Sequence, residues 1–279
     1  MTSSSRLSPQ LFAILRHLVE EKSGLHYRAE DADVFADKLL GRMAEAGFES
    51  ALDYYYRLRY DDESGAELNA LVDALVVGET YFFREVDAVR AAIRQVVEPA
   101  IRERGRAVIW SAACATGEEP LSVAVLLAEA GLLDRSTIRA TDISQRAIAR
   151  AREGRYGGRS LRALHDDPNL ATLAERWLGA TKGSAQASPR LLAAIDYEVD
   201  NLVAGRRPEL SARFDLVLCR NVLIYFADDN VQRVVGHLAD ALRPDGRLLV
   251  GASESLLRFG TRLRCEERSG TFFYAKDVS

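Results

Sequence analysis

The sequence predicts an α/β fold in which a mostly parallel sheet is covered by helices, preceded by a small all-α domain. Two observations predict it. From about residue 107 onward, apolar strand-like runs alternate with amphipathic helical runs, whereas residues 1–76 show helical periodicity with no strand pattern between the helices. Alternating units of this kind imply a parallel sheet with both faces covered. Ligands of such sheets bind outside the carboxyl ends of the strands.

The amino-terminal part has clear helix signals. Ser8 is a suitable N-cap, Pro9 occupies the first helical position, and Gly24 follows the last apolar position of the pattern. The helices expected in this part span residues 8–22, 31–46, 50–60 and 64–77.

The remainder supplies the elements of the sheet. The turn expected at Arg243–Gly246 separates a helix from a strand, and Thr271–Ala275 with Leu263–Cys265 predicts a terminal antiparallel hairpin. Residues 154–194 mix glycines, prolines and short amphipathic pieces, and predict an irregular insertion. Strands are expected at 107–113, 137–143, 195–199, 214–219, 246–252 and 271–276, and helices at 120–130, 144–153 and 228–242.

Three segments follow from these patterns. Residues 1–76 form a helical domain, residues 77–88 are a linker, and residues 89–279 are a catalytic-type α/β domain that carries the insertion. The first segment holds 8 Lys and Arg against 14 Asp and Glu, a net charge of −6, within a chain whose net charge is −4. This uneven distribution of charge fits two modules better than one.

Composition excludes several classes of protein. The chain has 279 residues, is 48% hydrophobic and has no basic stripe, so nucleic-acid binding is not expected. No apolar run is long enough to insert into a membrane. Cys114, Cys219 and Cys265 have no metal-ligand or disulfide spacing, and the first two are expected to be buried as small hydrophobic residues. We therefore expect a soluble monomer of a reducing compartment.

A turn of small residues ends the first strand. Ala113–Gly117 lets a ligand lie close to the backbone, and the following helix start offers free N–H groups. Glu118 and Glu119 would repel a phosphate at that helix start, so they favour a cationic or hydroxyl-rich ligand. Their alternative role is a favourable interaction with the helix dipole.

Asp142 ends the second strand, where an acid commonly accepts hydrogen bonds from ribose hydroxyls. Its alternative role, capping the following helix, can be filled by Ser144. A ribose-binding acid beside a turn without a phosphate grip indicates a nucleoside ligand that lacks a pyrophosphate. S-adenosylmethionine, which carries a sulfonium and no phosphate, is the obvious candidate.

Several motifs occur in one order along the chain and together resemble the CheR-type chemotaxis-receptor glutamate methyltransferases. The resemblance runs from Leu11 to Tyr274. It implies a class I S-adenosylmethionine-dependent methyltransferase domain behind an amino-terminal helical domain, in a cytoplasmic bacterial protein recruited to receptor arrays. The motifs are Gly78–Glu85, Thr116–Pro120, Asp142 and Arg220–Phe226.

The resemblance also implies a role for each matching position. Arg84 and Thr80 would contact the methionine part of the cofactor, together with position 78, and Glu119 would approach its amino group. Asp142 would hold the ribose, and Tyr225 would face the methyl group. The remaining cofactor-binding positions, along the turn, the adenine and the end of the fourth strand, are Ala113, Asn201, Leu202, Arg220 and Asn221.

The implied reaction is methyl transfer from S-adenosylmethionine to a glutamate carboxylate of a chemoreceptor's cytoplasmic domain, which gives a γ-methyl ester and S-adenosylhomocysteine. A carboxylate is ionised at neutral pH, so no general base is required. Arg84 and Tyr225 are the residues expected to orient that carboxylate. Methyltransferases that act on amino groups often carry an Asn/Asp-Pro-Pro-aromatic tetrad, whereas this chain has Asn221–Ile224 there. The alternative is a regulator that binds the cofactor without this transfer.

Three features depart from the family pattern. Gly78 stands where the family usually has Asn, and Leu121 stands where an aromatic residue is common, so weaker cofactor binding is expected. The family's helical domain is thought to meet acidic receptor helices through a basic helix, whereas the helical domain of this chain is acidic. General electrostatic steering toward an acidic receptor is therefore not expected from it.

Overall fold

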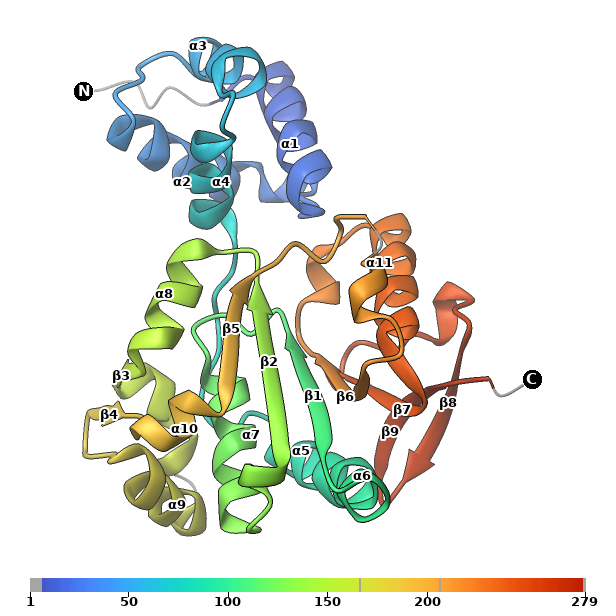
Figure 1. The fold of residues 1–279 in the computed structure, drawn as a ribbon. Helices are drawn as coiled ribbons and strands as arrows, with labels where there is room; N and C mark the ends of the chain where they lie inside the picture. The colour runs from blue at the N-terminus through green and yellow to red at the C-terminus, as the bar shows by residue number, and fades with distance from the viewer. Residues whose placement is uncertain (1–6, 166, 206, 278–279) are drawn as a thin grey trace. The chain divides into compact units, whose positions relative to one another are not determined.

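The computed structural model describes residues 7–165, 167–205 and 207–277, and it divides the chain into two compact units (Figure 1). One unit contains the residues up to Val77 together with Tyr225–Asn230. The other contains Gly78–Ile224 and the residues from Val231 onward. No local pattern in the sequence indicated that the six residues Tyr225–Asn230 belong with the helices.

The first unit is helical, as its periodicity predicted. Ser8 caps the first helix by accepting a hydrogen bond from Leu11 N–H (3.2 Å), and Gly24 ends it with a left-handed φ of 77°. The fully buried rings of Phe35 and Tyr54 lie in its core. The helices are α1 (Pro9–Ser23), α2 (Ala32–Glu45), α3 (Ala51–Tyr56), which continues as a π-helix over Arg57–Asp61, and α4 (Ala66–Leu75).

The second unit is built on a seven-stranded sheet in the order β5-β2-β1-β6-β7-β9-β8. The first five of these strands run parallel, and β9 lies antiparallel between β7 and β8, which confirms the predicted terminal hairpin. The strands are β1 (Ala107–Ala112), β2 (Ser136–Asp142), β5 (Ile195–Val199), β6 (Phe214–Cys219), β7 (Leu242–Val250), β8 (Leu263–Arg268) and β9 (Thr271–Lys276).

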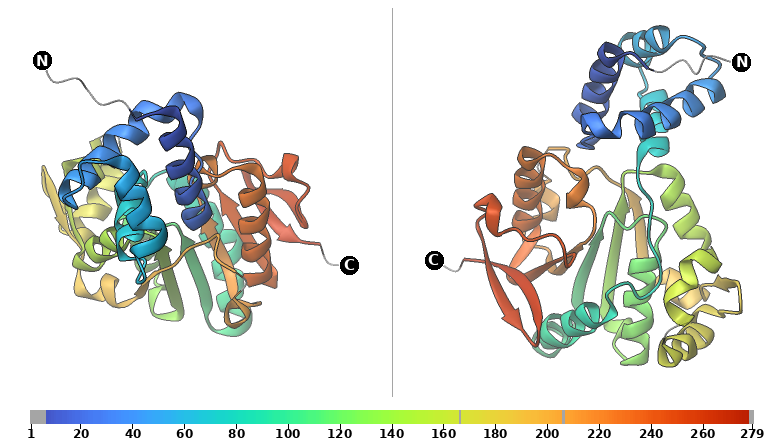
Figure 2. Two further views of the ribbon diagram at one scale, coloured as in Figure 1. Left: turned by 90° about the horizontal axis from the view of Figure 1, so that it is seen from above. Right: turned by 180° about the vertical axis from the view of Figure 1, so that it is seen from behind.

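Helices cover both faces of this sheet (Figure 2). On one face, Ile109 of β1 belongs to a core shared with the helices before β1 and after it. On the other face, the neighbouring Trp110 lines a cavity together with residues of the helix that follows β6. The helices are α5 (Val86–Ala92), which continues as a π-helix over Ile93–Val97, α6 (Glu98–Arg104), α7 (Glu118–Glu129), α8 (Gln145–Glu153) and α11 (Asp228–Ala241).

The insertion is more regular than the sequence indicated. It contains a small antiparallel sheet and two helices, and its buried leucines join the same core as α7. Packing against the main sheet supplies the order that local sequence does not show. Its elements are β3 (Arg155–Gly157), a 3₁₀ segment (Gly158–His165), α9 (Pro168–Leu178), β4 (Ser184–Gln186) and α10 (Pro189–Ala193).

A second expectation also needs correction. The predicted turn at Arg243–Gly246 lies inside β7, where the register with β6 shifts between Phe214 and Leu216. Pro244, which suggested a turn, is therefore accommodated in the strand by a bulge in the hydrogen-bond ladder. Cys114 and Cys219 are buried as expected, at 2% and 0% exposure. In the described part of the chain, no helix is long and apolar enough to cross a membrane.

Candidate active site

The turn after β1 is formed by small residues in unusual backbone conformations. Ala113, Ala115 and Gly117 all have positive φ values, of 64°, 47° and 93°. The left-handed region is costly for an alanine, so the surroundings must hold this turn in place. A side chain at Gly117 would also collide with the Cβ of Ala151, 2.8 Å away. The turn is thus a fixed, closely packed piece of backbone.

Asp142, at the end of β2, holds that turn. Its Oδ2 accepts a hydrogen bond from Ala115 N–H (2.8 Å), and its Oδ1 accepts one from Ser144 N–H (2.9 Å). Ser144 caps α8 by accepting a hydrogen bond from Ala147 N–H (3.0 Å), as the sequence suggested. The carboxylate of Asp142 therefore lies at the carboxyl edge of the sheet, between two strand ends, where the ribose acid of this fold is expected.

Arg220, just beyond β6, is buried between two carboxylates. Its Nη1 lies 2.8 Å from Glu119 Oε2 and its Nη2 lies 3.1 Å from Glu85 Oε2, while the side chain itself is only 2% exposed. Arg220 also donates to the backbone carbonyl of Arg84 (2.7 Å), and Ser111 Oγ donates to the other oxygen of Glu119 (2.6 Å). Arg220 therefore connects β6, the start of α7 and the linker.

The charges in this cluster stabilise one another. Burial disfavours the charged form of Arg220, but Glu119 and Glu85 raise its pKa above the ordinary value. Burial would raise the pKa of Glu85, but the charge and hydrogen bonds of Arg220 lower it overall. Arg220 and Glu85 are therefore both held in their charged forms at neutral pH.

The linker places Arg84 between two buried aromatic anchors and the site. Phe82 and Phe83 are 0% and 3% exposed and belong to the main core. Arg84 itself is half-buried, donates to the carbonyl of Glu79 (3.3 Å) and lies 5.7 Å from the centre of the Tyr81 ring. Among the residues that the structure describes, its guanidinium forms no ion pair, so it is available for an anionic group.

Glu254, which sequence reasoning missed, holds the loop after β6. Its Oε2 accepts hydrogen bonds from Asn221 N–H (2.5 Å) and Gly251 N–H (2.9 Å), and its Oε1 accepts one from Ile224 N–H (3.3 Å). Asn221 adopts a left-handed φ of 58°, a conformation that asparagine tolerates better than most residues. Glu254 lies four residues after β7, so the strand-end rule applied to that strand could have found it.

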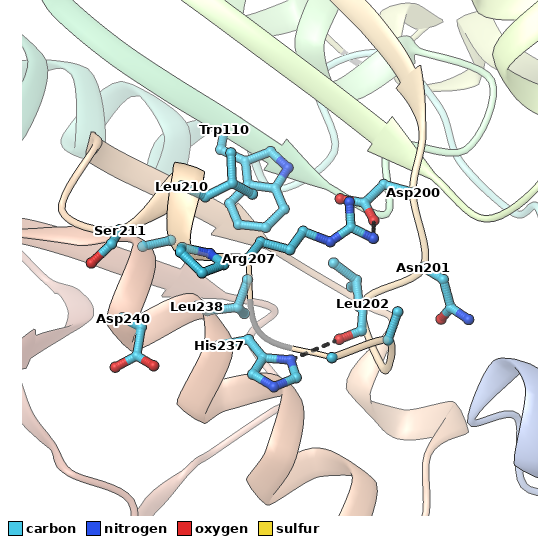
Figure 3. Close-up of a pocket in the computed structure, with 14 residues that line it drawn as sticks. Trp110, Asp200, Asn201, Leu202, Arg207, Leu210, Ser211, His237, Leu238 and Asp240 are labelled. Atoms are coloured by element: carbon cyan, nitrogen blue, oxygen red, sulfur yellow. Dashed lines mark hydrogen bonds and ion pairs between the residues drawn. The ribbon is translucent and has the colours of Figure 1, made fainter.

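Asn201 and Leu202, proposed for the adenine, line a mostly apolar cavity of about 310 Å³ (Figure 3). The carbonyl of Leu202 is within hydrogen-bond distance of His237 Nδ1 on α11 (3.2 Å), and Asn201 Oδ1 accepts a hydrogen bond from Val203 N–H (3.2 Å). The loop that carries both residues is therefore held from α11.

The structure brings most of the predicted site residues into the α/β unit. Ala113, Glu119, Asp142, Arg220 and Asn221 all lie at strand ends or helix starts of one sheet edge. Leu121, which stands where an aromatic residue is common in the family, is fully buried in the core, so this departure concerns packing. Tyr225 belongs instead to the helical unit, where its carbonyl accepts a hydrogen bond from His26 N–H (2.8 Å).

These residues fit a nucleoside cofactor that carries a cationic centre and no phosphate. A braced turn of small residues and an acid at the end of β2 suit a ribose, whereas two glutamates at the start of α7 disfavour a phosphate. The residues that the structure describes include no group of three or more His, Cys, Asp or Glu that could hold a metal ion. The fold is that of an S-adenosylmethionine-dependent methyltransferase of class I, and the chemistry of these residues suits that cofactor.

Comparison with known proteins identifies the family. Residues 78–271 match the S-adenosylmethionine-binding domain of CheR methyltransferases, and residues 10–76 match the all-alpha domain of the same family. The chain therefore belongs to the CheR methyltransferase family, and its cofactor is S-adenosylmethionine.

Named relatives cover most of the chain. Chemotaxis protein methyltransferase 2 of Vibrio cholerae is 30% identical over 94% of this chain and 92% of its own length. The chemotaxis protein methyltransferase of Escherichia coli is 29% identical over 91% of this chain and 87% of its own. The probable biofilm formation methyltransferase WspC of Pseudomonas aeruginosa is 33% identical over 86% of this chain and 56% of its own.

Proposed function

We propose that this chain is a protein-glutamate O-methyltransferase that modifies the cytoplasmic domain of a methyl-accepting chemoreceptor. The product would be a γ-glutamyl methyl ester, with S-adenosylhomocysteine released. One observation carries the proposal: the helical part and the α/β part both match the same family, and relatives of nearly the same length are chemotaxis protein methyltransferases.

The chemistry of the site supports a carboxylate as the acceptor. S-adenosylmethionine supplies an electrophilic methyl group on a sulfonium. A glutamate side chain is ionised at neutral pH and needs no base to activate it. Glu119 and Glu85, the acidic side chains paired with Arg220, are held by that pairing and are not poised as proton acceptors. The protein's contribution is then to bind both partners in line and to exclude water.

Each proposed contact follows from the position of a residue. Arg84, together with Thr80 and the backbone at Gly78, would bind the methionine carboxylate, and Glu119 would bind the amino group. Asp142 would accept hydrogen bonds from the ribose. The turn backbone at Ala113, the loop residues Asn201 and Leu202, and the pair Arg220 and Asn221 would complete the cofactor site.

The biological role of the chain depends on which receptor it modifies and which signalling pathway that receptor controls. We propose a cytoplasmic protein that acts at receptor arrays, because its relatives are chemotaxis methyltransferases. Two relatives from Pseudomonas species are probable biofilm formation methyltransferases, so the same reaction can serve a chemotaxis-like pathway other than motility. Because the helical domain is acidic, it would not attract acidic receptor helices in general. We therefore propose a dedicated receptor as the partner of this chain.

The test is incorporation of radiolabelled methyl groups from S-adenosylmethionine into membranes of the native cell. Label on a receptor-sized band that mild base releases as methanol would support ester formation on glutamate. Base-stable label would instead place the methyl group on another acceptor. Absence of label, with cofactor binding confirmed by calorimetry, would favour a regulator that binds the cofactor without this transfer.

Tyr225 offers a second test of the same proposal. Because Tyr225 is proposed to face the methyl group, Tyr225→Phe should lower kcat and leave the affinity for S-adenosylhomocysteine nearly unchanged. Tyr56, which is also in the helical unit and is 51% exposed, supplies the matched control Tyr56→Phe, expected to behave like the wild type. An unchanged kcat in Tyr225→Phe would remove this hydroxyl from the mechanism.

A further inference from the structure

Glu118, next to Glu119 at the start of α7, has no place in the cofactor site proposed above, yet it is buried at 2% exposure. Its Oε2 accepts a hydrogen bond from Thr116 Oγ (2.6 Å), and its Oε1 accepts one from Ser160 Oγ (2.8 Å). Thr116 is in the cofactor turn, whereas Ser160 is in the 3₁₀ segment of the insertion. A single carboxylate therefore joins the insertion to the turn.

The same residues hold the backbone of the linker. Phe82 N–H donates to the carbonyl of Ser160 (2.9 Å), and Phe83 N–H donates to Ser122 Oγ (2.9 Å). Ser122 Oγ in turn donates to the backbone carbonyl of Glu118 (2.6 Å). The two residues that immediately precede Arg84 are therefore hydrogen-bonded to Ser160, whose hydroxyl the Glu118 carboxylate holds, and to Ser122, which is bonded to the Glu118 backbone.

A second set of contacts joins the insertion to the linker and the turn. Arg162 forms an ion pair with Glu79 (2.6 Å), and its guanidinium carbon lies 3.9 Å from the centre of the Tyr81 ring. Tyr156 OH donates to the carbonyl of Thr116 (2.9 Å). Linker residues on both sides of Thr80 are thus held by the insertion.

Burial of a carboxylate is costly, and packing alone gives no reason for one at this position. An apolar side chain would fill the same space without the desolvation cost. Two hydroxyl donors recover part of that cost, and they come from segments that are 44 residues apart in sequence. The carboxylate is therefore best explained by the bridge that it forms.

We propose that Glu118 is a positioning residue: through Ser160 and Thr116 it makes the insertion part of the cofactor site, because it sets where the linker presents Thr80 and Arg84. Glu118 does not touch the cofactor in this proposal. The inference rests on the proposed roles of Thr80 and Arg84, and it assigns the insertion a task in cofactor binding.

The experiment measures S-adenosylhomocysteine affinity by calorimetry for the full chain and for Glu118→Ala, Ser160→Ala and the double variant. Each single variant should bind about tenfold more weakly, consistent with the loss of a hydrogen bond to a charged group. The double variant should be little worse than either single one, because both changes break one bridge. Glu118→Gln should restore most of the affinity, because an amide can accept one hydroxyl hydrogen bond and donate the other.

The matched control is Gln186→Ala, in the same insertion. Gln186 is exposed, and its side chain accepts a hydrogen bond from Arg155 and donates one to the carbonyl of Glu153, both outside the linker and the turn. It should bind the ligand like the wild type. If Glu118→Ala does not fold, the test rests on Ser160→Ala, at a partly exposed position, and on Glu118→Gln.

Two outcomes would overturn the proposal. In one, Ser160→Ala and Glu118→Ala lower the free energy of unfolding but leave the affinity unchanged, which would make Glu118 a structural residue only. In the other, the losses of affinity in the double variant simply add. The readout is separate from receptor methylation, so failure of the proposed reaction would appear as absent methyl transfer with this binding pattern intact.

Discussion

The two sides of the candidate site differ in how they are held. The strand-end side (Ala113–Glu119, Asp142 and Arg220–Asn221) is buried and cross-linked by charged groups, with Arg220 at 2% side-chain exposure. The linker side (Gly78–Arg84) is anchored by the buried Phe82 and Phe83, but its ion pair between Arg162 and Glu79 has side chains 36% and 52% exposed. The charged contacts of the first side are therefore buried, whereas the ion pair of the second side lies near solvent.

The two sides should differ most in the free energy of unfolding that is lost when one arginine is removed from each. Arg220→Met leaves Glu119 and Glu85 without their buried partner and should lower the free energy of unfolding by about 3–5 kcal/mol. Arg162→Met breaks an exposed pair and should cost about 1 kcal/mol or less. Urea denaturation of both variants checks the comparison, and equal losses would contradict it.

Arg84 should separate binding from stability. Arg84→Ala removes the proposed partner of the cofactor's carboxylate, so affinity for S-adenosylhomocysteine should fall by about 10- to 100-fold, with little change in unfolding. Arg94→Ala, an exposed arginine in the same unit, is the control, and calorimetry is the measurement. Unaltered affinity in Arg84→Ala would exclude this residue from the cofactor site.

The free energy of unfolding should depend moderately on pH through Glu118, the buried carboxyl between the two sides. Burial raises the pKa of Glu118 above its ordinary value of 4.5. The folded state therefore holds this proton more tightly than the unfolded chain, and the associated stability is present below about pH 4.5. It is lost as the pH rises through the folded-state pKa.

Unfolding measured across this pH range tests that sign. The free energy of unfolding of the wild type, relative to Glu118→Gln, should decrease as the pH rises from about 4.5 toward neutrality. A relative stability that increased with pH would mean that the two hydroxyl donors outweigh burial and that the pKa is lowered.

The smallest expected change is a gain on the linker side. A Cβ built at Gly78 meets no atom within 4 Å, and its φ is not left-handed, so a side chain can be added there. Gly78→Asn should tighten S-adenosylhomocysteine binding several-fold, roughly one hydrogen bond of 0.5–1.5 kcal/mol. Gly78→Ala controls for the change in backbone freedom. Equal affinities in the two variants would show that the asparagine amide adds no contact.

Much of the fold followed from local patterns. Strand and helix periodicity predicted the strands of the main sheet and the helices α7, α8 and α11 to within a few residues at most ends, because burial of one face repeats along each element. The helices α5 and α6 were not predicted. The caps at Ser8 and Ser144 and the stop at Gly24 depend on neighbouring residues and could also be predicted. The terminal hairpin followed from its two apolar runs.

The tertiary structure decided which distant residues act together. Arg220 meets Glu119 and Glu85 across separations of 101 and 135 residues, and Glu254 holds Asn221 from 33 residues away. Such contacts leave no periodic trace in sequence, since each depends on how strands are ordered in the sheet. The bridge from Glu118 to the insertion and the placement of Tyr225 with the helices were hidden for the same reason. The sequence by itself determined the class of fold and the chemistry of the strand ends, and only folding brought the linker and the insertion into hydrogen-bond contact with those strand ends.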